Sequence, residues 1–77
     1  MSNGNALKKT VEMVQRVIAK AHGSTPITIL DAQQALKNAG HGNDAYRLAR
    51  YWMNYGTQSV GWNDYGDTLL VAEPFKC

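Results

Sequence analysis

The sequence predicts an α+β fold, with three helices followed by a C-terminal β-hairpin in a single domain over residues 1–77. Apolar residues recur at three- and four-residue spacing in three segments that each end near a glycine, as amphipathic helices do. Beyond Gly56 the period changes to two, in two short runs on either side of Asp64-Tyr65-Gly66-Asp67. A chain of 77 residues, 44% of them hydrophobic, has room for one core and excludes a two-domain protein.

The first predicted helix starts at Ala6, after a flexible lead over residues 1–5, and stops at Gly23. Its core face is formed by Leu7, Val11, Val14, Ile18 and Ala21. The other face is expected to stay in water and holds Lys8, Lys9, Glu12, Gln15, Arg16 and Lys20. With the next two helices this segment makes up a predicted helical core over residues 6–56.

Residues 24–28 cannot continue the helix, because Pro26 has no N–H to donate and restricts the residue before it to extended geometry. We predict a very short edge strand or extended link here. Thr28 then starts the second helix through an approximate capping box with Asp31, and Gly40 ends it. The predicted core face of this helix is Ile29, Ala32, Ala35, Leu36 and Ala39.

The third predicted helix runs from an N-cap at Asn43 to about Tyr55. Its buried stripe is Ala45, Leu48, Ala49 and Trp52. The hairpin is predicted over residues 57–73 and should close over this stripe, with Trp62 facing Trp52 in the core. Three further apolar residues are expected to pack around the two rings: Leu48, Val60 and Leu70.

This order of elements, with its glycine-bearing turn at residues 40–42, resembles winged helix-turn-helix domains over roughly residues 6–73. The resemblance implies that the extended link adds a third strand to the hairpin and that the third helix lies in the major groove of double-stranded DNA. The residues it turns toward the DNA are Asn43, Tyr46, Arg47, Arg50, Tyr51 and Asn54. Phosphate contacts are expected from Lys8, Lys9, Arg16, Lys20 and Lys37.

The side chains of the third helix suit this use, since Arg pairs bidentately with guanine, Asn with adenine, and Tyr with phosphate. Charge is divided unevenly. Residues 1–50 carry seven Lys/Arg and three Asp/Glu, a net +4, whereas residues 51–77 carry one and three, a net −2. Asp64 and Asp67 in the hairpin turn would repel phosphates, so the hairpin is not expected to grip DNA.

Two hypotheses for function follow. The first is a small DNA-binding regulator of the repressor or excisionase type, for which a homodimer is one suitable state. The second is a protein that phages or mobile elements make to inhibit a host protein complex of transcription, restriction or CRISPR. Tyr and Arg are enriched at protein hot spots as well, so the chemistry of the third helix does not separate a DNA partner from a protein partner. A third interpretation is a plain solvated helix side, with the Tyr rings packed against the hairpin.

Catalysis is not expected, and neither is a cofactor or a metal. His22 and His41 stand beside glycines in predicted turns, with no carboxylate or thiol at the spacing of a nucleophile or zinc site. Cys77 is the only cysteine, which rules out a disulfide within the chain. No apolar run reaches the ~20 residues of a membrane span, so the sequence predicts a cytoplasmic protein.

Overall fold

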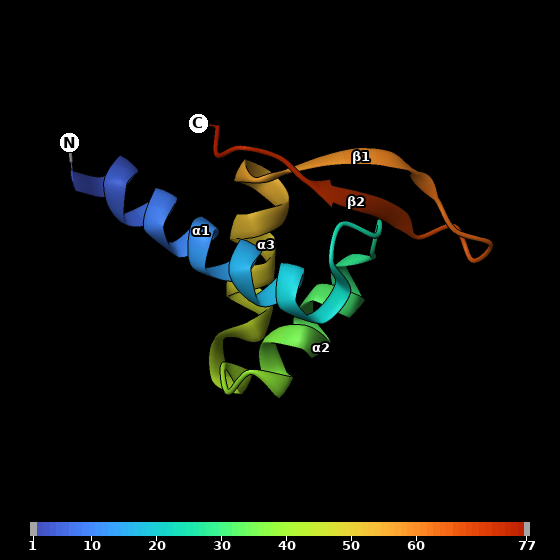
Figure 1. Cartoon of the computed structure of the whole chain (residues 1–77), viewed down its shortest axis with the longest axis horizontal. Helices are drawn as coiled ribbons and strands as arrows, with labels where there is room; N and C mark the ends of the chain where they lie inside the picture. The colour runs from blue at the N-terminus through green and yellow to red at the C-terminus, as the bar shows by residue number, and fades with distance from the viewer. Residues whose placement is uncertain (1, 77) are drawn as a thin grey trace.

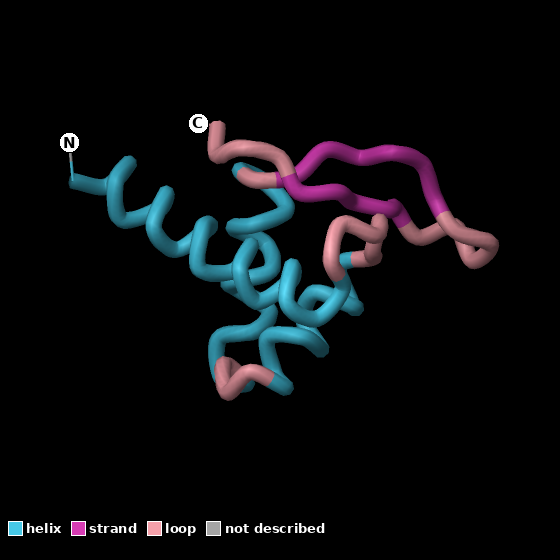
Figure 2. The backbone as a smooth tube through the Cα atoms, viewed as in Figure 1, coloured by secondary structure: helices cyan, strands magenta, loops and turns pink. Residues whose placement is uncertain are grey.

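The computed structural model describes residues 2–76 and confirms the predicted α+β fold class. Its elements are α1 (Ser2–His22), α2 (Ile29–Asn38), a 3₁₀ turn η1 (Gly42–Asp44), α3 (Ala45–Tyr55), β1 (Thr57–Trp62) and β2 (Thr68–Ala72). The three helices pack together and the antiparallel hairpin follows them, an arrangement consistent with a helix-turn-helix core plus a wing (Figures 1 and 2). Residues 57–72 are called the wing from here on.

The first helix is longer than the sequence indicates. It starts at Ser2, so the prediction of a flexible lead is wrong for residues 2–5, and the first residue of that lead lies outside the described residues. Once a helix exists, each added residue gains a backbone hydrogen bond while fixing only its own dihedral angles. The part of α1 anchored in the core therefore extends backward through Gly4 and Asn5 despite their low helix propensity.

The link before α2 behaves as predicted. Ile27 and Leu70 exchange two backbone hydrogen bonds, with N···O distances of 3.0 and 2.7 Å, in a single antiparallel bridge to β2. The capping box of α2 is confirmed as well. Asp31 N donates to Thr28 Oγ1 and Thr28 N donates to Asp31 Oδ2, both at 3.2 Å. The link thus fixes where α2 begins and attaches that point to the wing.

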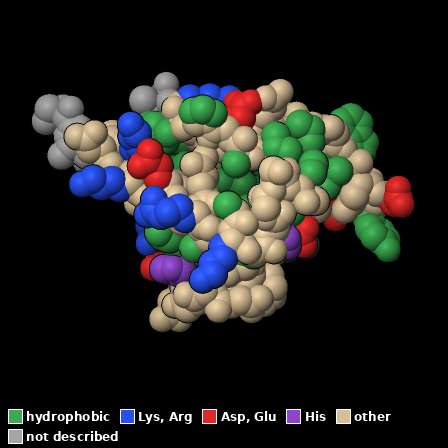
Figure 3. Space-filling view, viewed as in Figure 1, with side chains coloured by type: hydrophobic (Ala, Val, Ile, Leu, Met, Phe, Trp, Pro, Cys, Tyr) green, Lys and Arg blue, Asp and Glu red, His purple; other side chains and the backbone are tan. Residues whose placement is uncertain are grey.

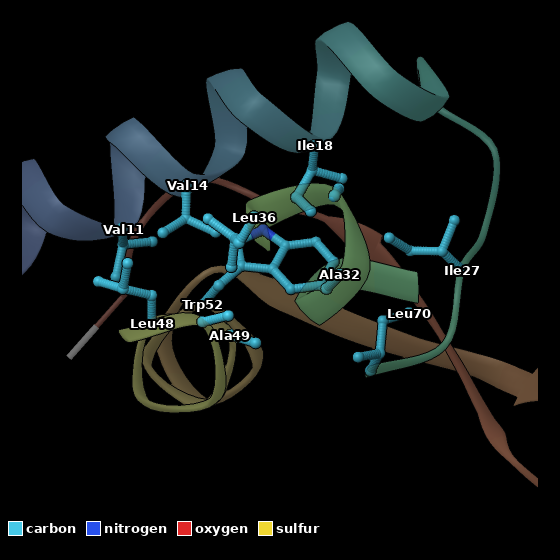
Figure 4. Close-up of a cluster of buried hydrophobic side chains, with 12 residues drawn as sticks. Val11, Val14, Ile18, Ile27, Ala32, Leu36, Leu48, Ala49, Trp52 and Leu70 are labelled. Atoms are coloured by element: carbon cyan, nitrogen blue, oxygen red, sulfur yellow. The ribbon is translucent and has the colours of Figure 1, made fainter. Parts of the chain in front are cut away.

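The core lies where the three helices meet, around the indole of Trp52 (Figure 4). Trp52 is fully buried, as predicted from its stripe. Side chains from every helix, from the link and from β2 surround it: Val11, Val14, Ile18, Ile27, Ala32, Ala35, Leu36, Ala45, Leu48, Ala49 and Leu70. One buried stripe on each helix therefore holds α1, α2 and α3 together.

The wing does not close over this core. Trp62 exposes 73% of its surface and Val60 49%, so the prediction that both pack against Trp52 is wrong. A β-bulge leaves Val60 without a cross-strand partner and changes the register of β1 against β2. The wing also projects beyond the helices (Figure 1), and Leu70 is the wing residue that belongs to the buried cluster. A bulge and a lack of helix beneath the tip keep the outer wing in water.

Gln15 has a role that the sequence analysis missed by placing it on the water face of α1. Its Nε2 donates to the carbonyl oxygens of Gly56, at 3.2 Å, and Glu73, at 2.6 Å. These two residues flank the wing, and Glu73 N donates to Gly56 O at 2.8 Å. A half-buried amide on α1 thus holds the base of the wing against the helices.

Among the described residues, no helix is both long and apolar enough to cross a membrane.

Candidate functional site

The outer side of α3 is open, while its inner side is anchored in the core. Ala45, Leu48, Ala49 and Trp52 are buried, and the residues between them at helical spacing point outward. Tyr46, Arg47, Arg50 and Asn54 are exposed and Tyr51 is half-buried. These five residues are called the α3 face. The structure therefore brings together on one accessible surface all the predicted contact residues of this helix.

Each arginine of the α3 face packs on a tyrosine four residues away. Arg50 Cζ lies 5.6 Å from the centre of the Tyr46 ring, and Arg50 Nη1 donates to Tyr46 Oη at 3.4 Å. Arg47 Cζ lies 5.5 Å from the centre of the Tyr51 ring. Such cation–π pairs use the flat side of the guanidinium, whereas bidentate recognition uses the N–H groups at its edge. Each guanidinium group of the α3 face thus lies over a tyrosine ring of the same helix.

The two arginines differ in their surroundings. Arg47 Nη2 lies 3.3 Å from Asp44 Oδ1 in an exposed ion pair, which contributes little to stability in water. Tyr51, the larger cause, and Asp44 raise the pKa of the Arg47 guanidinium, so it stays charged throughout the physiological range. Arg50 packs on Tyr46 and forms no ion pair within the described residues. Arg50 is therefore the stronger candidate for reading an anion or a base edge, since Asp44 partly offsets the charge of Arg47.

Asn43 is exposed beside the start of α3, but it does not cap that helix as predicted. It lies in η1, and Asp44 occupies the N-cap position without a side-chain capping bond. The chain enters α3 through a 3₁₀ turn, in which Asp44 N donates to His41 O at 3.1 Å. The tight turn moves the helix start one residue onward. Asn43 stays next to the α3 face as a predicted contact.

The basic residues of α1 do not share a surface with the α3 face. Arg16, Lys20 and Lys9 are exposed on the side of α1 opposite to the stripe that packs in the core. Because α1 and α3 meet through their inner sides, their outer sides point away from each other. Lys8 is also exposed on α1, and Lys37 is exposed on α2. A basic surface separate from the α3 face is therefore formed by Lys9, Arg16 and Lys20.

The described part of the chain holds no cluster of metal-ligating side chains comparable to the α3 face. Within residues 2–76, no three or more His, Cys, Asp or Glu side chains gather as they would around a metal ion. Comparisons with protein-family models, with curated proteins and with solved structures give no match.

Proposed function

We propose that the chain is a small, non-enzymatic DNA-binding regulator that inserts α3 into the major groove. The observation that carries this proposal is the exposed α3 face, in which Arg47 and Arg50 are each packed on a tyrosine. An arginine held in this way loses less conformational freedom when it binds a base edge or a phosphate. The prearranged guanidinium groups favour recognition over a merely solvated helix.

The shape of the domain supports the same proposal. α3 has 11 residues, and an α-helix with its side chains is ~10–12 Å across, which matches the ~12 Å width of the major groove. α2 packs against its inner side, so the outer side can enter the groove as an exposed ridge. The turn of the wing carries Asp64 and Asp67, which disfavours phosphate contacts there. α3 would thus make the main contact with DNA.

The test compares Arg50→Ala with the wild type on a duplex selected from a random pool. We expect Arg50→Ala to weaken binding by about 1–3 kcal/mol and to relax the preferred sequence at one position, because a bidentate base contact is lost. Fluorescence anisotropy in a salt series measures both the affinity and the number of phosphate contacts. Lys9→Ala removes an equal charge from the side of α1 that points away from the α3 face, where no phosphate contact is made when α3 lies in the groove; it is the matched control, with affinity close to that of the wild type.

Two outcomes would count against DNA binding through α3. One is equal affinity of wild type and Arg50→Ala with the same sequence preference. The other is the lack of any salt-dependent binding to duplex DNA. The second outcome would favour the alternative proposal, in which the same α3 face binds a host protein complex and inhibits it, since Tyr and Arg serve protein interfaces equally well.

A further inference from the structure

The tip of the wing presents apolar surface to water. Tyr65 exposes 90% of its surface, Trp62 73% and Val60 49%; Asp64 lies between Trp62 and Tyr65 in the sequence, and Asp67 follows two residues after Tyr65. These five residues are called the wing tip. Figure 3 shows hydrophobic and acidic side chains gathered at this end of the molecule. Single exposed apolar residues are ordinary, but three within six positions on a projecting hairpin mark an interaction surface.

The wing tip is held in one shape. Asn63 Oδ1 accepts hydrogen bonds from the backbone N–H groups of Tyr65 and Asp67, both at 2.9 Å. Asn63 N also donates to Asp67 O at 2.9 Å, and Gly66 takes the left-handed conformation that the turn requires, with φ 85°. A preorganised turn loses little entropy on binding, which suits it to present aromatic rings to a partner.

A second partly apolar surface, with positive instead of negative charge beside it, lies between α1 and α2. It is a shallow groove of about 380 Å³, called the α1–α2 groove, lined by Val17, Lys20, Ala21, Ala35, Asn38, Ala39 and His41. Its floor is apolar and its small alanines leave room for a side chain from outside. Lys20 stands at its edge, and Arg16 is exposed one turn earlier on the same side of α1. The groove thus has an apolar floor with the charge of Lys20 at its edge, and Arg16 adds a second positive charge nearby on α1.

The wing tip and the groove complement each other in charge and in polarity. Residues 57–72 contain two Asp and no Lys or Arg, whereas α1 contains Lys8, Lys9, Arg16 and Lys20 against Glu12. The wing points away from the helices along the 41 Å length of the molecule (Figure 1), so its tip is far from the groove of its own chain. Two wing tips facing each other would place like charges together. These observations favour a second copy of this chain as the partner.

We infer that the wing tip of one copy docks in the α1–α2 groove of a second copy. Trp62 and Tyr65 cover the apolar floor, and Asp64 and Asp67 face Arg16 and Lys20 of the neighbour. The contact joins two different surfaces, so it builds a ring or a head-to-tail chain. The α3 face remains open in this assembly, and the docking does not depend on whether the chain binds DNA.

Sedimentation velocity of the purified chain, without DNA and over a range of concentrations at low salt, tests the inference. We expect reversible self-association that weakens with salt, because charged groups contribute to the contact. Trp62→Ala/Tyr65→Ala and Arg16→Glu/Lys20→Glu should each raise the dissociation constant at least about tenfold, as loss of an interface anchor does. Lys8→Glu/Lys9→Glu makes the same change in charge elsewhere on α1 and should associate like the wild type.

Mixing the two deficient variants gives the sharpest result. The wing variant keeps an intact groove and the groove variant keeps an intact wing tip, so together they should form a 1:1 heterodimer that cannot extend. The substituted side chains are exposed, and circular dichroism melts verify that each variant folds. In the wild type, the emission of Trp62 should shift to shorter wavelength as the concentration rises, which needs no variant at all.

Several results would overturn the inference. A wild-type chain that stays monomeric at every concentration has no such contact, and capture of a different protein through Trp62 would then assign the wing tip to that protein. Association that survives in the wing variant uses another surface. If Arg16→Glu/Lys20→Glu still associates and the wing variant does not, the wing tip binds a surface other than the groove. The same conclusion follows if the two variants form no heterodimer when they are mixed.

Discussion

Trp52→Ala is expected to unfold the chain or leave it barely folded at 25 °C. Trp52 is fully buried at the meeting point of the three helices, and residues from every helix line its cavity (Figure 4). Replacing a core Trp by Ala costs about 3–5 kcal/mol, from lost burial and from the cavity that remains. A domain of 77 residues has only about 4–12 kcal/mol of stability in total. The substitution therefore removes a large part of what holds the fold.

Thermal and urea melts followed by far-ultraviolet circular dichroism measure this loss. Trp52→Phe should be much milder, because a ring still fills most of the space and the buried Nε1 of Trp52 has no hydrogen-bond partner within the described residues. Trp62→Ala serves as the matched control and should change stability by no more than about 0.5 kcal/mol, since that ring is exposed. A cooperative melt of Trp52→Ala close to that of the wild type would refute the assignment of the core.

Gly56→Ala is expected to destabilise the fold by about 1–3 kcal/mol through crowding. A Cβ at this position would lie 2.7 Å from Val11 Cγ1 and 2.9 Å from Gln15 Nε2. Val11 is fully buried, and Gln15 is held by its hydrogen bonds at the base of the wing. Gly to Ala alone stabilises a chain by about 0.4–1 kcal/mol through the unfolded state, which is too little to offset this overlap.

Gly42→Ala gives the comparison that isolates crowding. A Cβ there would meet no atom within 4 Å, and Gly42 does not have a positive φ. We expect this variant to be as stable as the wild type or up to about 1 kcal/mol more stable. Urea unfolding of both variants gives the two changes on one scale. If Gly56→Ala matches Gly42→Ala, the close approach of α1 to the base of the wing does not exist in solution.

Local signals in the sequence predicted most of the architecture. The helical periodicity found most of the inner stripes of α1, α2 and α3, and Thr28 with Asp31 marked the start of α2. Ala21 and Ala39, predicted for the core faces of the first two helices, are exposed at the ends of their stripes. Helix ends were less exact, since α1 starts earlier than Ala6 and α3 is entered through η1 and not capped by Asn43. The residue at which a helix begins or ends depends on small differences in hydrogen-bond energy, and a neighbouring turn can change these differences.

The candidate site was predictable only where it follows from one helix. The spacing of Tyr46, Arg47 and Arg50 against the buried stripe is enough to put them together on the outer side of α3. The position of Arg16 and Lys20 on a different surface depends on how α1 packs, which no local pattern contains. Gln15 looks like a water-facing residue for the same reason, because its two carbonyl partners lie far along the chain.

The sequence by itself determined the order of the three helices and two strands, most of the inner stripe of each helix and the open polar face of α3. Short-range periodicity and glycine, proline and capping residues are sufficient for these features. Only the tertiary structure decided that Trp62 is exposed, that Gln15 holds the base of the wing and that the acidic tip and the basic groove lie apart. A single bulge at Val60 changes the strand register. Whether the ring of Trp62 is buried or exposed depends on which element packs beneath the wing, and none does so at its tip.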